Sequence, residues 1–173
     1  MHDNEVVRIG PEPLTPEDVV RVARYGAAVR LAEDAIAEMA AARSRVEELA
    51  EGSLPAYGVS TGFGALATRH IPTELRAKLQ RSLIRSHAAG SGPEVETEVV
   101  RAMMLLRLRT LATGHTGVRP RVAQALAGLL NARLTPIVHE YGSLGCSGDL
   151  APLAHVALAI MGEGRVRDAA GAE

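Results

Sequence analysis

The sequence predicts an all-α protein in which two glycine-rich loops interrupt a series of helices. Apolar residues recur at helical spacing in several long segments of the chain. Hydrophobic residues make up 47% of the chain, but aromatic residues make up only 2% and tryptophan is absent. A core of Leu, Val, Ile, Met and Ala favours closely packed helices over a large β-sandwich, which usually relies on aromatic and β-branched residues.

The first helical segment covers residues 14–52. Thr15 suits an N-cap, Pro16 suits the first helical position, and Asp18 follows the cap by three residues. Apolar residues then continue at helical spacing, with a break expected between Gly26 and Glu33. Gly52 is a typical helix stop, so this segment is expected to pack its apolar face into the core.

The rest of the chain alternates loops with helices. Residues 53–71 are rich in glycine and proline and predict the first loop, and residues 133–148 predict the second. Leucines on one stripe indicate a helix that ends at Gly90, and the next helix is expected to begin at Pro93 and Glu94. The expected helical ranges after the first segment are 73–90, 93–114, 119–132 (closing near Asn131) and 149–161.

Composition limits the class of protein. The chain has 173 residues, enough for one domain with a real core, and a net charge of -1. That charge gives no electrostatic case for binding nucleic acid or an acidic membrane surface. A single cysteine, no secretory signal and no apolar run long enough to span a bilayer predict a cytoplasmic protein. The Gly- and Ala-rich end after the last helix indicates either a natural tail or a cut in a longer protein.

Metal and phosphate motifs do not fit. "HEYGS" begins like a metalloprotease helix but has Ser143 where the second histidine is required. The other histidines lack ligand spacing, so no metal site is expected. "GVSTGFG" lacks both the dinucleotide fingerprint and the lysine of a phosphate-binding loop.

The stretch "GSLGCSGDLAPL", residues 142–153, allows three interpretations of Ser147. A nucleophile elbow requires Gly where Asp149 stands, and it requires a strand before the serine. Ser147 could instead be the N-cap of the 149–161 helix, with Asp149 near the positive end of the helix dipole.

The third interpretation uses the peptide itself. In X-Ser-Gly, the Gly148 nitrogen can attack the carbonyl carbon of Cys146, and loss of water from Ser147 leaves an exocyclic methylidene. Glycine allows the close backbone approach, and the first residue supplies only its carbonyl. The product is an electrophile that no standard side chain provides.

"GSLGCSGDLAPLAH" resembles the signature of the aromatic amino acid ammonia-lyases, in which a methylidene-imidazolone (MIO) group forms autocatalytically from Ala-Ser-Gly. "YGVSTGFG" resembles the tyrosine loop of that family, and "LQRSLIRSHAAGSGP" its selectivity helix. "TGHTGVRP" and "LNARLTPIVHEYGSLG" are also similar to family segments, so the likeness covers roughly residues 14–165. Within the family, the histidine ammonia-lyases of actinobacterial type are the most similar.

The resemblance implies that Cys146, Ser147 and Gly148 cyclise to MIO, with Ser147 becoming the dehydroalanine unit and Asp149 assisting maturation. Cys146 departs from the usual Ala. The ring chemistry uses only the carbonyl of that residue, so MIO formation is still expected. No external cofactor and no metal are implied.

The resemblance also implies the substrate contacts. Tyr57 would be the acid/base residue that handles the β-proton or the amine of the substrate. His87 would face the substrate side chain, and Ala88 after it favours histidine over tyrosine. Gly64 would line the site with its backbone.

The implied activity is non-oxidative deamination of L-histidine to trans-urocanate and ammonia, in histidine catabolism. Family members are several-fold longer and homotetrameric, so residues 1–173 are expected to be an N-terminal MIO-bearing domain that is inactive alone. Tyrosine ammonia-lyase or tyrosine 2,3-aminomutase activity is the alternative, because His87 suits tyrosine too. A second alternative is an inactive helical fragment with an uncyclised Cys-Ser-Gly.

Overall fold

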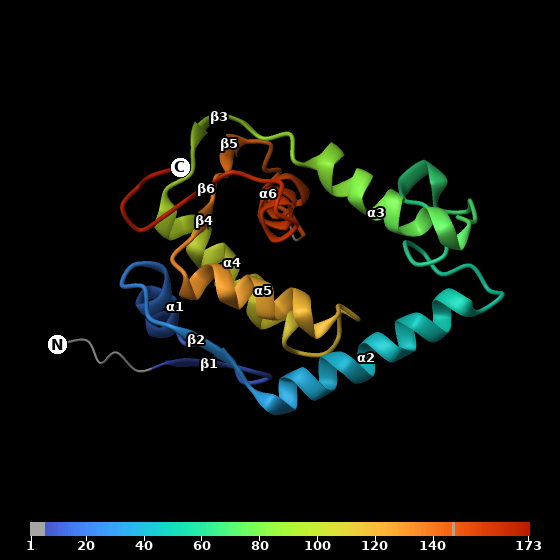
Figure 1. The fold of residues 1–173 in the computed structure, drawn as a ribbon, viewed down its shortest axis with the longest axis horizontal. Helices are drawn as coiled ribbons and strands as arrows, with labels where there is room; N and C mark the ends of the chain where they lie inside the picture. Colours follow the sequence, from blue (N-terminus) through green and yellow to red (C-terminus); the bar gives the residue numbers. More distant parts are fainter. Residues whose placement is uncertain (1–5, 147) are drawn as a thin grey trace.

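The computed structural model describes residues 6–146 and 148–173, and it confirms the all-α prediction (Figure 1). Short strands and one 3-10 turn, η1 (Gly64–Leu66), connect the helices. The helices are α1 (Pro16–Ala23), α2 (Glu33–Glu51), α3 (Thr73–His87), α4 (Thr97–Leu111), α5 (Pro120–Asn131) and α6 (Leu150–Ile160). The strands are β1 (Val7–Ile9), β2 (Val29–Leu31), β3 (Ser91–Glu94), β4 (Thr135–Pro136), β5 (His139–Tyr141) and β6 (Val166–Arg167).

The strands form three separate two-stranded ladders within the described residues. β1 pairs with β2 in parallel, β3 pairs with β5 antiparallel, and β4 pairs with β6 antiparallel. The sequence predicts none of these strands: β4 and β5 lie in the second predicted loop, and β3 overlaps the start expected for the 93–114 helix. Strands of two to four residues are too short to show an alternating pattern, and their partners lie far away in the chain.

The start of the first helical segment is confirmed in detail. The Thr15 hydroxyl accepts a hydrogen bond from the Asp18 backbone N–H at 3.1 Å, and the Asp18 carboxylate accepts one from the Thr15 N–H at 3.1 Å. This is a complete capping box. The expected break is also confirmed, because the chain turns at Gly26, where φ is +70°, and forms β2 before α2 begins.

One predicted helix start is wrong. α4 begins at Thr97, because Pro93 and Glu94 belong to β3, where Glu94 pairs with His139 of β5. The helix expected over 149–161 is confirmed as α6, with Asp149 as its N-cap residue, and the alternative that Ser147 is the cap falls on a residue outside those described. α5 ends at Asn131 as expected, and the amide of that side chain bonds to both backbone groups of Val29 at 2.8 and 3.0 Å.

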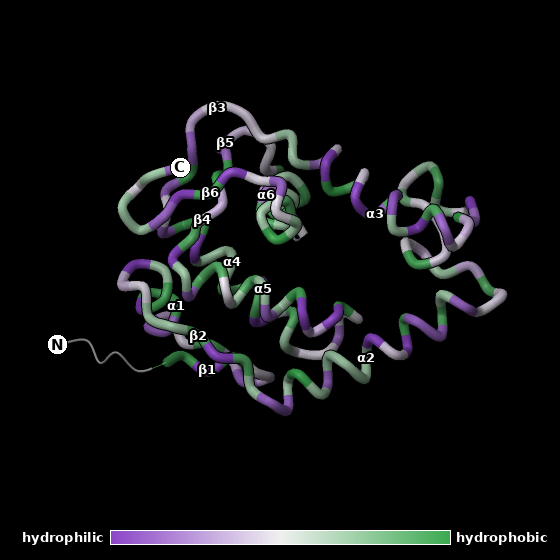
Figure 2. Tube along the Cα trace, in the orientation of Figure 1, coloured by the Kyte–Doolittle hydropathy of each residue, from purple (hydrophilic) through white to green (hydrophobic). Residues whose placement is uncertain are grey.

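The core lies where α4 packs against α1 and α5 (Figures 1 and 2). We call β1, β2, α1, α2, α4 and α5 the helical body. Its largest fully buried apolar side chains are Ile9, Val22, Met39, Val100, Met104, Leu105, Leu108, Leu126 and Leu130.

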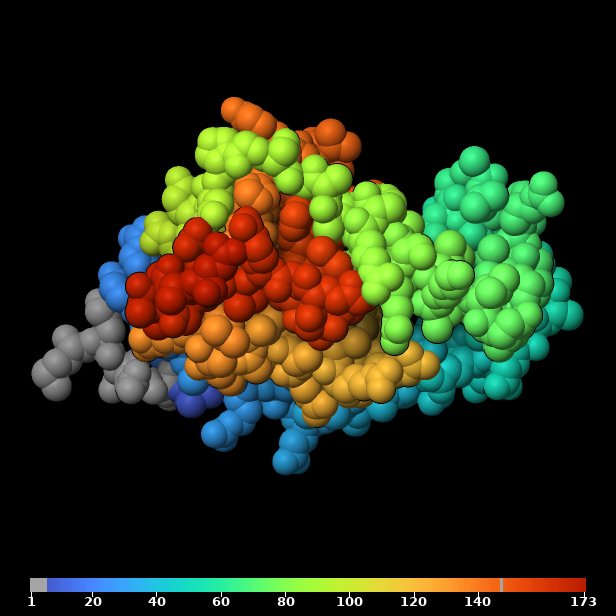
Figure 3. All heavy atoms as spheres, turned by 45° about the horizontal axis from the view of Figure 1, so that its top comes forward, coloured from blue at the N-terminus to red at the C-terminus, as the bar shows by residue number. Residues whose placement is uncertain are grey.

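Residues 53–94, which we call the arm, leave the far end of α2 and return along α3 to β3 (Figure 1). In the space-filling view the first part of the arm forms one end of the molecule (Figure 3). α3 has no buried residue, and Leu75 on it is 47% exposed. No described helix is both long and apolar enough to cross a membrane.

Candidate active site

Tyr57 lies in the first glycine-rich loop and is 64% exposed. Its Oη accepts a hydrogen bond from the Gly64 N–H at 3.3 Å, and its ring makes an edge contact with Phe63 at a centroid distance of 5.8 Å. Gly64 has φ +54°, and a Cβ there would meet no atom within 4 Å. The loop therefore brings two predicted site residues, Tyr57 and Gly64, into direct contact.

Polar groups shape this loop. The buried Ser60 hydroxyl accepts from the Ala56 N–H at 2.9 Å, and the buried Thr61 hydroxyl accepts from the Gly58 N–H at 3.2 Å. Gly58 has φ +68°, and a Cβ there would lie 2.7 Å from the Phe63 ring, so only glycine fits. Gln80 of α3 donates to the Gly58 carbonyl at 3.0 Å and fixes the loop to the helix.

His87 is the last residue of α3 and is half-buried. Its Nδ1 lies 2.8 Å from the Leu83 carbonyl oxygen and 3.0 Å from the Ser86 hydroxyl. The Ser86 hydroxyl donates to the same carbonyl, which can only accept, so Nδ1 carries a proton and donates. Nε2 of the neutral ring is then an acceptor. The position suits a side chain that receives an N–H or O–H from a ligand.

The second glycine-rich loop leads into the triplet 146–148 and then into α6. Gly145 and Gly148 have φ +62° and +70°, and a Cβ on either would meet nothing within 4 Å. Cys146 is an exposed, free thiol. The backbone around the triplet is therefore turned and unobstructed among the described residues, while Ser147 lies outside them.

Asp149 holds this loop closed. Its carboxylate accepts hydrogen bonds from the Ser143 hydroxyl and, at 3.1 Å, from the Leu144 N–H. The Ser143 hydrogen bond, followed by the backbone N–H groups of Leu144 and Gly145, lowers the pKa of Asp149 below its ordinary value. The side chain is therefore a carboxylate at neutral pH, and it bonds backwards along the chain, making no side-chain cap to α6.

The arm and the second glycine-rich loop, which contains the triplet, meet at Gly90 and Gly142. A Cβ on Gly142 would lie 3.1 Å from the Gly90 Cα and 3.2 Å from the Ala151 Cβ of α6. The Gly90 N–H donates to Nε2 of His155, on α6, at 3.0 Å. The end of the predicted selectivity helix therefore lies against the helix that follows the triplet, whereas the hydrogen bond and ring contact of Tyr57 both stay within its own loop.

Sequence reasoning missed the role of two histidines at this junction. His139 of β5 and His155 of α6 make an edge contact at a centroid distance of 5.9 Å, and His139 Nδ1 lies 2.9 Å from the Gly92 carbonyl oxygen. Each looks isolated along the chain, because its backbone partner is 47 or 65 residues away. No spacing rule connects residues so far apart, and the only signal in the sequence was that both residues are histidines.

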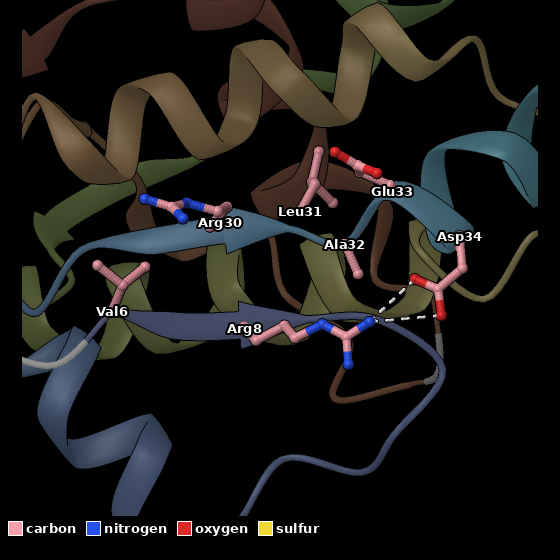
Figure 4. Close-up of a pocket in the computed structure, with 7 residues that line it drawn as sticks. All are labelled: Val6, Arg8, Arg30, Leu31, Ala32, Glu33 and Asp34. Carbon is pink, nitrogen blue, oxygen red and sulfur yellow. Dashed lines mark hydrogen bonds and ion pairs between the residues drawn. The ribbon is translucent and has the colours of Figure 1, made fainter.

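The surface hollows lie elsewhere. A groove of about 600 Å³ lies along β1, β2 and the start of α2, where Arg8 pairs with Asp34 at 3.2 Å (Figure 4). Three further hollows of about 260 to 440 Å³ also lack Tyr57, His87 and the described triplet residues. Among residues 6–146 and 148–173, no group of three or more His, Cys, Asp or Glu side chains is placed to hold a metal ion.

Residues 14–172 match the family model described as aromatic amino acid lyase. The chain is 66% identical to a histidine ammonia-lyase of Streptomyces griseus over 158 residues, which are 91% of this chain and 31% of that protein. A tyrosine aminomutase from Streptomyces globisporus superposes with a TM-score of 0.88 at 41% identity, over 95% of this chain and 31% of that one. Ergothionase from Treponema denticola superposes with a TM-score of 0.91 at 32% identity, over 95% of this chain and 33% of that one.

The chain thus spans about a third of the length of these relatives. The matched region includes both glycine-rich loops and all six described helices. The chain belongs to the aromatic amino acid lyase family.

Proposed function

We propose that this chain is the N-terminal part of a histidine ammonia-lyase, which converts L-histidine to trans-urocanate and ammonium. The observation that carries the proposal is the 66% identity to the Streptomyces griseus enzyme over 158 residues. The whole protein would act in the cytoplasm as a homotetramer, with residues beyond these 173 completing the active site. Residues 1–173 would be its MIO-bearing domain, inactive when alone.

The prosthetic group would be MIO, formed from Cys146, Ser147 and Gly148. The described residues fit it, because Gly145 and Gly148 turn the backbone at positive φ, with open space where a Cβ on either would lie. The exposed Cys146 would contribute its carbonyl and keep its thiol outside the ring. When formed, the group supplies an electrophile that makes the substrate amine a better leaving group.

Asp149 would assist maturation by holding the turn. Its carboxylate accepts from Ser143 and Leu144, so the residues before the triplet are drawn back toward the start of α6. A closed turn brings the Gly148 nitrogen and the Cys146 carbonyl toward each other, which lowers the entropic barrier to cyclisation.

Tyr57 would take the proton from Cβ of the substrate. As that C–H bond and the bond from Cα to the amine break, the Cα–Cβ double bond forms and ammonia departs. The Gly64 N–H donates to the Tyr57 oxygen at 3.3 Å and so fixes the position of the atom that would take the proton. This arrangement supports the acid/base role inferred for Tyr57 and the backbone role inferred for Gly64.

His87 would bind the substrate side chain. Because Nδ1 is committed to the Leu83 carbonyl, Nε2 can accept a hydrogen bond from the imidazole N–H of the substrate. A tyrosine hydroxyl could donate to the same atom.

Tyrosine is therefore the second candidate substrate, for an ammonia-lyase or a 2,3-aminomutase. The 41% identity to a tyrosine aminomutase favours it, but less than the 66% identity favours histidine. Assays with L-His, L-Tyr and L-Phe, with the products separated by chromatography, distinguish the two.

The decisive variant is Ser147→Ala in the full-length protein. Urocanate formation, followed by absorbance, should fall by about 10²-fold or more, because the variant cannot form the methylidene electrophile. Gly128→Ala is the matched control, since Gly128 is exposed on α5 and a Cβ there meets nothing within 4 Å. Near-normal turnover by Ser147→Ala would overturn the proposed chemistry.

A further inference from the structure

The chain turns sharply directly after His87. The Ala89 N–H donates to the His87 carbonyl at 2.8 Å, and Ala88 between them has φ −76° and ψ 60°. These are the values of an inverse γ-turn, the tightest turn available to the backbone. His87 is therefore tied through a short turn to Gly90, three residues later.

Gly90 is where the arm contacts α6. Its N–H donates to His155 Nε2 at 3.0 Å, and a Cβ on Gly90 would lie 2.9 Å from that nitrogen. Gly142, the residue after β5, lies close to both Gly90 and Ala151, because a Cβ on it would lie 3.1 Å from the Gly90 Cα and 3.2 Å from the Ala151 Cβ. Ala151 and His155 are four residues apart, so both lie on the face of α6 that contacts the arm.

The proton positions on both histidines follow from their partners. His155 accepts at Nε2, so its ring is neutral with the proton on Nδ1, and His139 donates from Nδ1 to the Gly92 carbonyl. Burial lowers the pKa of His155, and the nearby charge of His139 lowers it further. His155 therefore keeps its acceptor nitrogen at neutral pH.

A direct chain of contacts links His87 to the triplet. It runs through the γ-turn to Gly90, across the hydrogen bond to His155, and along the first turns of α6 to Asp149 and Gly148. α3 and α6 also pack directly against each other, and Arg85 of α3 pairs with Glu163, which follows α6, at 2.7 Å, with side chains that are 56% and 35% exposed. Exposed pairs of this kind are weak, so the half-buried His155 bond constrains Gly90 more than the ion pair does.

We propose that His155 is a positioning residue, which fixes His87 at a set distance from the triplet and thereby sets the affinity for the substrate side chain. The inference rests on the proposed function, because it takes His87 as the residue that faces the substrate. His155 touches neither substrate nor reacting atoms, and it acts through Gly90 and His87.

The test compares His155→Leu with His155→Gln in the full-length enzyme. Leu removes the acceptor, whereas the side-chain oxygen of Gln can accept from the Gly90 N–H. His155→Leu should raise KM for L-histidine about tenfold, with kcat changed less than about threefold, and Gln should restore most of the loss. His115→Leu, the same change at an exposed loop histidine, is the matched control and should leave KM within about twofold.

Amide hydrogen exchange gives a readout that does not depend on the reaction. The segment around Gly90 should exchange faster in His155→Leu and return toward the wild-type rate in His155→Gln. If Leu does not give folded protein, His155→Asn replaces it, because the shorter side chain cannot reach the Gly90 N–H.

The outcomes separate the two proposals. Faster exchange at Gly90 with unchanged KM overturns the positioning role, as does a KM loss that Gln leaves unrestored. If the wild-type enzyme converts another aromatic amino acid in place of L-histidine, the proposed substrate is wrong. The same KM comparison is then made with that amino acid, and the positioning role stands or falls on it.

Discussion

The helical body and the arm are built on different physical principles. All of the buried apolar side chains found among the described residues lie outside residues 53–94, most of them in the body, whereas the buried residues of the arm include Ser60 and Thr61. The arm keeps its shape through hydrogen bonds, such as those from Arg76 to the Ala50 and Ile71 carbonyls at 2.7 and 3.0 Å. Both substrate-facing side chains proposed here, Tyr57 and His87, lie on the arm.

The difference shows that the proposed substrate-facing residues lie outside the best-packed part of the fold. Apolar burial stabilises a scaffold, and the residues proposed to act on substrate project from a segment with little burial of its own. Such segments open more readily than a core, and they need further contacts to become rigid. The hydrogen bond from Gly90 to His155 is one such contact, and we expect the rest of the full-length enzyme to supply others.

The largest expected difference in stability between the helical body and the arm is at a core leucine. Leu108 of α4 is 0% exposed, so Leu108→Ala should lower the free energy of unfolding by about 3–5 kcal/mol through lost burial and a new cavity. Leu75→Ala on the arm is the matched control, and it should cost less than about 1 kcal/mol because Leu75 is 47% exposed. Chemical denaturation measures both, and equal losses would mean that the arm is packed as tightly as the body.

Replacing a buried arginine should give the next largest loss of unfolding free energy. Arg101 is 4% exposed, and its guanidinium donates to the Val22 carbonyl at 2.9 Å and the Leu130 carbonyl at 3.3 Å. Arg101→Met keeps an apolar stem but removes the donor from two carbonyls near helix ends, which should cost about 2–3 kcal/mol of unfolding free energy.

Its control is Arg24→Met, which removes an exposed pair with Glu98 at 2.7 Å. Exposed pairs contribute little, so this loss should stay below about 1 kcal/mol. Indistinguishable losses from the two variants would show that burial does not set the value of these arginine contacts.

The smallest expected effect concerns Asp149. Its pKa is lowered first by the Ser143 hydroxyl, so Ser143→Ala should raise that pKa toward the ordinary value of about 3.9. A lowered carboxyl pKa means that the contribution of Asp149 to stability is present above that ordinary value and is lost as pH falls through the folded pKa. NMR titration of the Asp149 carboxyl carbon measures the change, and an unaltered titration would contradict the hydrogen-bond assignment.

The sequence predicted the helices well because their apolar residues repeat at a period that needs no distant partner. The capping box at Thr15 and the end of α5 at Asn131 are both local signals, and both are confirmed. The start of α4 was misplaced because Pro93, a common first residue of helices, belongs here to a strand paired with distant β5. Motif resemblance located the two loops and the family, but no local signal could show the contact between Gly90 and His155.

The same limit applies to Asp149. Its position after the triplet suggested a favourable charge at a helix start, and its carboxylate instead bonds backwards to Ser143 and Leu144. A side chain at this position can serve the helix or the preceding loop, and only the path of residues 142–146 decides between them. The partners of a site residue that are set by the path of a loop can therefore be identified only from the structure.

The central claim is that the main chain at residues 146–148 closes into a ring, and intact mass tests it most directly. The full-length protein, digested to isolate the peptide that contains "GSLGCSGDLAPL", should give a peptide about 36 Da lighter than its sequence, the mass of two waters lost in one cyclisation and one dehydration. The same peptide from Ser147→Ala should lack the dehydration. A wild-type peptide at its full, unshifted mass, from protein that deaminates its substrate at the normal rate, would contradict the account.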